Sequence, residues 1–169
     1  ETDLKPAFAK GGTITAANSS SISDGAAALI LMSASKASSL GLEPLARIIG
    51  HATHAQQPSE FAIAPIASIQ KLLSHVAWSK DQVDLFEINE AFAMVTMLAM
   101  QELGLDHGKV NVNGGACALG HPIGASGARI IVTLIHALRR LNKSKGVASL
   151  CIGGGEATSC LLYTSPSPR

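Results

Sequence analysis

Apolar residues recur at helical spacing in two parts of the chain. The first stripe follows Pro65, which the opening turn of a helix tolerates, and consists of Ile66, Ile69, Leu72, Leu73 and Val76. The second consists of Ile130, Ile131, Leu134, Ile135, Leu138 and Leu141. A third helix is expected from Glu90 to Leu103, with Asn89 at its cap position and Gly104 closing it.

Short runs of β-prone residues lie between these helices. Residues 43–55, 82–88 and 146–152 are predicted strands, and the last of them is expected to be the final strand. The apolar run 26–32 is interpreted as a strand buried on both faces, followed by a short helix over about 33–40. Strands alternating with helices of these lengths indicate an α/β layered fold with a largely parallel sheet.

The two ends of the chain depart from this pattern. Residues 1–10 have no initiator methionine, helix cap or strand pattern, and we expect them to be the start of a fragment. The last ten residues, CLLYTSPSPR, carry two prolines among serines, which end a strand or helix. We therefore expect residues 160–169 to be disordered or a sequence artefact.

Composition and charge argue against several classes of function. The 169 residues are 47% hydrophobic, which is enough for one domain with a core, and the net charge is +1. With 4% aromatic residues and no basic cluster longer than Arg139–Arg140, no nucleic-acid partner is expected. The longest apolar run, Ala26–Met32, is far too short for a membrane span, and no secretory leader is visible.

The cysteines indicate the compartment. There are three, an odd number without C-x-x-C spacing, which favours a reducing compartment and gives no zinc pattern. We therefore expect a cytoplasmic protein without a membrane partner or a bound metal.

Three polar residues follow strands or open helices, where α/β sheets bind ligands. They are Asn89, His121 and Cys151. Asn89 has a plain alternative as a helix cap, and Cys151 as a small buried hydrophobe. His121 differs because Pro122 forces its backbone out of the helical region. Its segment also holds five glycines, namely Gly114, Gly115, Gly120, Gly124 and Gly127. A cysteine hydrolase with a histidine base fits the same residue types, whereas nucleotide-loop motifs are missing.

Four sequence blocks, in order, resemble the thiolase family. They are ITAANSSSISDGAAALILMS at 14–33, NEAFA at 89–93, NVNGGACALGHPIGASGAR at 111–129 and CIGGGEA at 151–157. The resemblance implies a layered thiolase fold in which residues 1–41 end the N-terminal domain and 42–159 form the C-terminal domain. Residues 160–169 would be a tail outside the family pattern.

The resemblance implies acyl transfer between coenzyme A thioesters. The match is to the biosynthetic type, which condenses two acetyl-CoA molecules to acetoacetyl-CoA and catalyses the reverse thiolysis. Coenzyme A would be substrate and product, with no tightly bound cofactor, and the full-length protein would be a dimer or tetramer. The alternatives are a 3-ketoacyl-CoA thiolase of fatty-acid β-oxidation and a non-catalytic acyl-CoA-binding protein. A ketoacyl-synthase type fits less well, because Cys151 stands where a second histidine is expected.

The resemblance also assigns roles to residues of this chain. His121 would activate the nucleophile, Asn89 would hold an oxyanion water, and Cys151 would be the second acid/base. Gly153 would present a backbone N–H to the second oxyanion site. Two further residues would contact the substrate, Ser20 beside the pantetheine and Phe92 at the acyl pocket. The family's nucleophilic cysteine lies upstream of the first block, so we expect this chain to be a thiolase C-terminal part that is inactive by itself.

Overall fold

Four strands form a single sheet in the computed structural model, which describes residues 3–165. They are β1 (Arg47–Ala55), β2 (Leu85–Ile88), β3 (Lys145–Ile152) and β4 (Glu156–Tyr163), arranged in the order β1-β4-β3-β2. β4 pairs antiparallel with both β1 and β3, whereas β2 and β3 are parallel. The expectation of a largely parallel sheet was therefore wrong. The reason is the short turn at 153–155, which joins β3 to β4 as a hairpin instead of a helical crossover.

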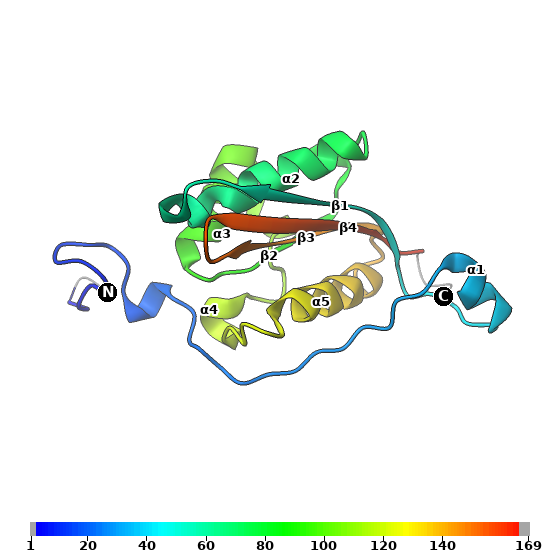
Figure 1. The fold of residues 1–169 in the computed structure, drawn as a ribbon, viewed down its shortest axis with the longest axis horizontal. Helices are drawn as coiled ribbons and strands as arrows, with labels where there is room; N and C mark the ends of the chain where they lie inside the picture. The colour runs from blue at the N-terminus through cyan, green and yellow to red at the C-terminus, as the bar shows by residue number, and fades with distance from the viewer. Residues whose placement is uncertain (1–2, 166–169) are drawn as a thin grey trace.

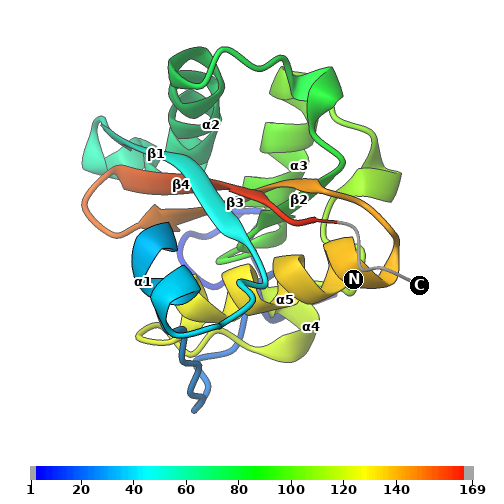
Figure 2. The ribbon, with the colours of Figure 1, turned by 90° about the vertical axis from the view of Figure 1, so that its right-hand side faces the viewer.

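Helices cover both faces of this sheet (Figures 1 and 2). α2 (Ala64–His75) and α3 (Ala93–Leu103) lie over one face, and α5 (Ser126–Arg140) lies over the other. Two short helices, α1 (Ala34–Ser39) and α4 (Ala116–Leu119), and four 3-10 turns complete the described part of the chain. The turns span Ala16–Asn18, Pro58–Ile63, Lys80–Gln82 and His107–Lys109. The α/β layered architecture and the predicted helices are thus confirmed, with Pro65 in the first turn of α2 and Gly104 closing α3.

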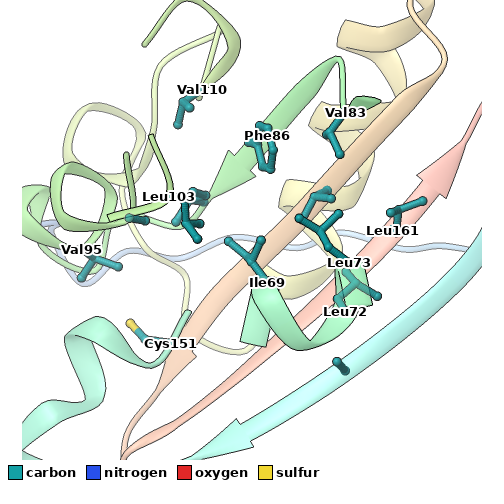
Figure 3. Packing of buried hydrophobic residues seen from close by; sticks show 14 of the residues in the cluster. Ile69, Leu72, Leu73, Val83, Phe86, Val95, Leu103, Val110, Cys151 and Leu161 are labelled. Atoms are coloured by element: carbon teal, nitrogen blue, oxygen red, sulfur yellow. The ribbon is translucent and has the colours of Figure 1, made fainter. Parts of the chain in front are cut away.

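Each face of the sheet has its own apolar core. The larger core lies under α2 and α3 and includes Ile69, Leu72, Phe86 and Leu161, all at most 1% exposed (Figure 3). The smaller core lies under α5, around Leu134. Because side chains alternate across a strand, successive residues of β3 enter different cores. Cys151 belongs to the core under α2 and α3, and this placement matters for the site.

The predicted strand at 26–32 was wrong. These residues have no regular secondary structure, and Ile30 and Leu31 are 88% and 73% exposed. The blue segment in Figure 1 is an extended chain that runs along the α5 side of the molecule toward α1. The sequence pattern describes a buried strand, but no strand within residues 3–165 pairs with it, so its backbone groups have no ladder to join.

The predicted tail begins too early. β4 continues through Tyr163, and Leu161 and Leu162 are 0% and 2% exposed between β1 and β3. Both prolines of the tail come after Tyr163 in the sequence, so neither lies within this strand. The disorder predicted for residues 160–163 was therefore wrong, and residues 166–169 lie outside the described part of the chain.

The boundary between β2 and α3 also differs from the prediction. α3 begins at Ala93 with Phe92 at its cap position, so Asn89 is not the helix cap. Asn89 instead extends the strand, because its backbone N–H donates to the carbonyl of Ser149 at 2.9 Å. Among residues 3–165, no helix is both long enough and apolar enough to cross a membrane.

Candidate active site

The parallel pairing of β2 with β3 brings two predicted site residues to one edge of the sheet. Ile88 is opposite Ser149, so Asn89 and Cys151 both lie where these strands end. Asn89 is 1% exposed and Cys151 is 8% exposed. The carboxyl ends of parallel strands are where α/β folds place ligands, and two of the three predicted site residues thus lie at one such edge.

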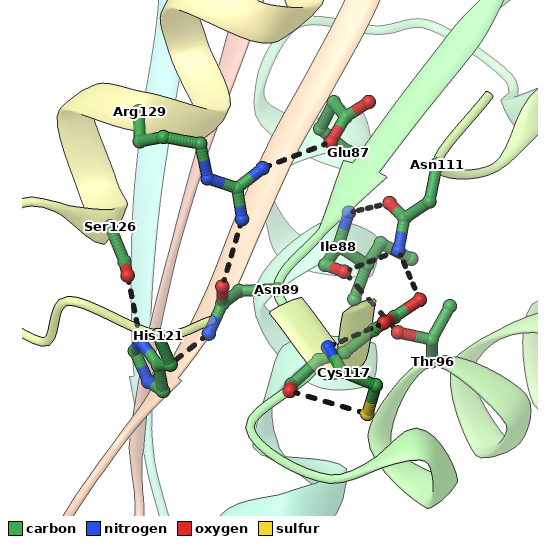
Figure 4. Close-up of polar contacts among 10 residues, drawn as sticks. Glu87, Ile88, Asn89, Thr96, Asn111, Cys117, His121, Ser126 and Arg129 are labelled. Atoms are coloured by element: carbon green, nitrogen blue, oxygen red, sulfur yellow. Dashed lines mark hydrogen bonds and ion pairs between the residues drawn. The ribbon is translucent and has the colours of Figure 1, made fainter. Parts of the chain in front are cut away.

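His121 reaches the same edge from the glycine-rich segment. Its Nε2 lies 3.3 Å from Nδ2 of Asn89, and its Nδ1 lies 2.6 Å from Oγ of Ser126 in the first turn of α5 (Figure 4). Oγ of Ser126 also donates to the carbonyl of Pro122 at 3.0 Å. On the other side of Asn89, Nη2 of Arg129 donates to its Oδ1 at 3.3 Å. These contacts form one continuous hydrogen-bonded row from Arg129 to Pro122.

The two ends of this row fix the direction of every bond in it. Arg129 can only donate, so the atom of Asn89 that faces it is the acceptor Oδ1, and Nδ2 faces His121. Nδ2 can only donate, so Nε2 of His121 accepts and Nδ1 carries the proton. The Nδ1–H then donates to Ser126, whose own hydroxyl proton goes to the Pro122 carbonyl. The network thus assigns His121 the tautomer in which Nε2 is the free base.

The surroundings favour the neutral form of this imidazole. Burial lowers the pKa of His121 below its usual 6.5, and the nearby Arg129 charge lowers it further. Arg129 on α5 is the charged group that acts on His121, and Arg129 in turn faces Glu87 on β2. A neutral histidine with an unprotonated Nε2 is suited to accept a proton near neutral pH.

Glu87 is a carboxyl group buried beneath this row. It is 2% exposed, and its Oε2 lies 3.8 Å from Nη1 of Arg129, too far for a hydrogen bond. Burial raises its pKa from 4.5 to about 7, although Arg129 lowers it, and Glu90 adds to the rise. Its Oε1 and Nη1 of Arg129 have no hydrogen-bond partner among the described residues. Glu87 therefore holds a proton far more readily than an exposed glutamate.

Glu90 holds the glycine-rich segment next to β2. One carboxylate oxygen accepts from the backbone N–H of Cys117 at 3.1 Å, and the other accepts from Nδ2 of Asn111 at 3.1 Å. Asn111 in turn bonds both the N–H and the carbonyl of Ile88, each at 2.8 Å. A Cβ at Gly115 would overlap the Glu90 carboxylate, so a side chain there would force that carboxylate out of its present contacts. This is one reason for the glycine pair before His121.

The N-terminal segment around Ser20 and Ser21 contacts both the loop that follows β2 and the loop that carries His121. The N–H and the hydroxyl of Ser20 both bond the carbonyl of Ala91, at 3.2 and 2.8 Å. One residue later, the carbonyl of Ser21 accepts from the N–H of His121 at 2.9 Å. Gly120, at φ 92°, passes so close to Ser23 that a Cβ would overlap its hydroxyl. The backbone position of His121 is therefore set from two sides.

Cys151 and Gly153 share the sheet edge but not the hydrogen-bonded row. No hydrogen bond within the described residues joins the Cys151 thiol to Asn89 or His121, and the thiol packs in the core under α2 and α3 (Figure 3). Burial raises the pKa of this thiol above its usual 9.0. Gly153 follows in the hairpin turn, with open space around its Cα. Phe92 packs edge-on against Phe8 and Phe61. The roles predicted for Cys151, Gly153, Ser20 and Phe92 stay predictions.

Comparison with known families decides the ancestry of this chain. The family model for the thiolase C-terminal domain matches residues 42–164, and that for the thiolase N-terminal domain matches residues 2–35. The chain belongs to the thiolase family. The C-terminal match includes the whole of β4, in agreement with the buried position of that strand.

Individual thiolases are similar over nearly the whole chain. A probable acetyl-CoA acetyltransferase of Dictyostelium discoideum is 56% identical over 160 residues, which is 95% of this chain and 39% of the relative. The structure of Bacillus anthracis acetyl-CoA acetyltransferase matches with a TM-score of 0.94 at 50% identity, covering 96% of this chain and 41% of that one. Human mitochondrial 3-ketoacyl-CoA thiolase in complex with CoA matches with a TM-score of 0.90 at 40% identity, covering 97% and 42%. The chain thus spans about 40% of the length of these thiolases.

Sequence reasoning missed two residues of the row, Ser126 and Arg129, and the buried carboxyl group of Glu87 beneath it. Each has a signal in the sequence. Glu87 is a charged residue inside a short apolar strand, where charge is rare without a partner. Ser126 and Arg129 are three positions apart at the start of a helix, so they lie on the same side of it.

Proposed function

We propose that this chain is the C-terminal part of an acetyl-CoA acetyltransferase, which joins two acetyl-CoA molecules into acetoacetyl-CoA and catalyses the reverse thiolysis. The observation that carries the proposal is the contact between Asn89 and a His121 whose Nε2 is the free base, at the edge where β2 and β3 end. The names of relatives at 50% identity or more support the acetyl-CoA substrate.

His121 is proposed to activate a cysteine nucleophile of the full polypeptide. Its Nε2 would exchange the 3.3 Å contact with Nδ2 of Asn89 for the thiol and take its proton. The thiolate would attack the carbonyl carbon of the acyl-CoA, from which coenzyme A leaves as the thiol. The protonated imidazole would then offer an N–H to the developing oxyanion. Nδ1–H stays on Ser126 throughout, so the ring keeps its orientation during the proton transfer.

Cys151 is proposed to handle the proton of the α-carbon. In thiolysis its neutral thiol would protonate the enolate of acetyl-CoA as the carbon–carbon bond breaks, and the resulting thiolate would take a proton in the opposite direction. The raised pKa of the buried thiol is suited to the donor role. The backbone N–H of Gly153 would stabilise the enolate oxygen, with open space beside it for the substrate.

Asn89, Ser20 and Phe92 are proposed to complete the substrate site. The second N–H of the Asn89 amide is available to hold a water at the thioester oxygen. Ser20 would contact the pantetheine by accepting a hydrogen bond, because its proton is given to Ala91. Phe92 would contribute one wall of a small acyl pocket, which its contacts with Phe8 and Phe61 keep in place.

The proposal also covers the compartment, the oligomeric state and the metabolic role of the enzyme. We propose a cytoplasmic homo-oligomer, a dimer or tetramer, acting in fatty-acid metabolism with coenzyme A as substrate and product and no bound cofactor or metal. Three free cysteines support a reducing compartment. Exposed apolar side chains such as Ile22, Ile30 and Leu31 support further contacts in the full protein.

The principal alternative is a 3-ketoacyl-CoA thiolase of β-oxidation. The likeness to the human mitochondrial 3-ketoacyl-CoA thiolase, 40% identical with a TM-score of 0.90, favours it as the second candidate. Both enzymes would use Asn89, His121 and Cys151 in the same way, so the two differ only in the acyl chain that they accept.

The test is a thiolysis assay of the full natural polypeptide that contains residues 1–169. We expect turnover of acetoacetyl-CoA, with much weaker turnover of a ten-carbon 3-ketoacyl-CoA. His121→Ala should lose about 10²–10⁴-fold in kcat. His136→Ala, an exposed histidine on α5, is the matched control and should keep full activity. Preference for the longer substrate would favour the alternative, and binding without turnover would mean a non-catalytic protein.

A further inference from the structure

Arg129 is placed to control the orientation of the Asn89 amide. Within the hydrogen-bonded row, the Arg129 side chain can donate hydrogen bonds but cannot accept them. It donates to Oδ1 of Asn89, whereas Nδ2 of the same amide faces His121. The amide of an asparagine can turn over and exchange its oxygen and nitrogen at little steric cost. With Arg129 present, the turned-over amide would direct its NH2 group at a guanidinium, which is a contact between two donors.

We infer that Arg129 is a positioning residue, which fixes the Asn89 amide and, through it, the tautomer of His121. Without Arg129, the turned amide would direct Oδ1 at His121, and the imidazole would then carry its proton on Nε2. Ser126 can serve either tautomer, because its hydroxyl accepts from Nδ1–H or donates to an unprotonated Nδ1. Ser126 therefore does not select the tautomer, and the selection comes from the other end of the row.

Glu87 has a separate part in this arrangement. It lies 3.8 Å from Arg129 and makes no hydrogen bond in the row, so its protonation does not change which groups donate. Removing Arg129 alone would leave a buried carboxyl without the one ion-pair partner it has among residues 3–165, and such a change is strongly destabilising. Glu87→Gln keeps the shape of the side chain and removes its charge. It is therefore the background in which Arg129 is best replaced.

The first experiment measures the tautomer directly, by long-range proton–nitrogen NMR correlations of the His121 ring in this chain. In the Glu87→Gln background we expect a single Nδ1–H tautomer. In Glu87→Gln/Arg129→Met we expect the Nε2–H form or a mixture of both. Glu87→Gln/Arg139→Met replaces an arginine near the other end of α5 and should behave as the background does. An unchanged Nδ1–H tautomer in the Arg129→Met variant, or an Nε2–H tautomer in the background, would overturn the inference.

The second experiment asks for the consequence in catalysis, and this part rests on the proposed function. In the full natural polypeptide, Glu87→Gln/Arg129→Met should lower kcat for thiolysis about ten- to a hundredfold relative to Glu87→Gln, because Nε2 no longer accepts a proton. The KM should change less than about twofold, and the pH profile should shift upward because a repelling charge near His121 is gone. Equal kcat values and superimposable pH profiles would contradict the positioning role.

The two readouts separate the two proposals. If the full polypeptide has no thiolase activity at all, the proposed function fails, yet the tautomer measurement still decides the role of Arg129. If the variant chain gives no dispersed spectrum, the kinetic comparison in the full polypeptide decides it. A loss of kcat that is equal at every pH, with the tautomer retained, would show a merely structural effect and would also overturn the inference.

Discussion

Glu87 shows how the cost of a buried charge depends on pH. In the unfolded chain this carboxyl titrates near 4.5, whereas burial in the four-residue strand β2 raises its pKa to about 7. The folded state therefore binds the proton more tightly than the unfolded state does. Stability that is fully present below about pH 4.5 is lost as the pH rises through 7.

Glu87→Gln should remove this pH dependence. A pKa difference between 4.5 and about 7 corresponds to about 3 kcal/mol at 1.36 kcal/mol per unit. We expect the stability of the variant, relative to the natural sequence, to rise by up to that amount between pH 5 and pH 8. Urea unfolding at several pH values measures it. Glu102→Gln, on the exposed side of α3, is the control and should show no such trend. Parallel curves for Glu87→Gln and the natural sequence would contradict the prediction.

The sequence predicted the residues that are proposed to react better than it predicted the residues that position them. Asn89 and His121 were predicted from their places after a strand and before Pro122, and the structure brings them into contact. The contact between Arg129 and Asn89 joins residues forty positions apart. Such a contact depends on how α5 packs against the end of β2, and a one-dimensional pattern does not contain that packing.

The glycine-rich segment shows the same dependence for a whole element. A Cβ at Gly115 would displace the carboxylate of Glu90, which follows β2 and reaches across to the loop. Gly124, nine residues farther along and before α5, has nothing near the position of a Cβ. The sequence shows both glycines alike, and only the packing separates them.

Gly115→Ala should therefore be far more costly than Gly124→Ala. The new methyl group would displace the Glu90 carboxylate and release the N–H of Cys117, at a cost of about 1–3 kcal/mol as for other overpacked sites. Urea unfolding measures the loss, and hydrogen exchange of the Cys117 amide should become faster. Gly124→Ala is the matched control. Equal stability of the two variants would mean that the Glu90 contact does not hold the loop.

Some strands can be predicted from their own residues, whereas others also depend on whether a neighbouring strand is available for pairing. β1, β2 and β3 were predicted from their residues to within a few positions. Residues 26–32 have an equally good strand pattern but no neighbouring strand among the described residues, so they stay open. β4 was missed: residues 146–152 were expected to be the final strand, and the nearby prolines outweighed the apolar residues before them.

Two truncations test the importance of the end of β4. Removing residues 160–169 deletes half of this strand, including Leu161 and Leu162, each of which is expected to contribute about 2–5 kcal/mol. That chain should fail to fold cooperatively. Removing only residues 166–169 should leave the unfolding transition unchanged. Circular dichroism and thermal unfolding compare the two, and a cooperative transition in the shorter chain would contradict the buried role of the strand.

For the molecule as a whole, we expect the isolated 169-residue polypeptide to be catalytically inert. Its cysteines lie at Cys117, Cys151 and Cys160, and each has a raised pKa through burial, which disfavours the thiolate needed for attack. An assay of acetoacetyl-CoA thiolysis should give no turnover, with the full natural polypeptide as the positive control. Turnover by the isolated chain would contradict this expectation and would require one of these three thiols to be the nucleophile.

The order of the strands also bears on how this chain is made. β4 is the last strand in the sequence and yet lies between β1 and β3. As the polypeptide leaves the ribosome, β1 is complete about a hundred residues before the strand that pairs with it, as in the match of His51 with Cys160. Until then β1 has no neighbouring strand, and the core under α2 lacks Leu161. Productive folding of this sheet therefore waits for residues 156–163, and nascent chains halted before them are candidates for aggregation or chaperone capture.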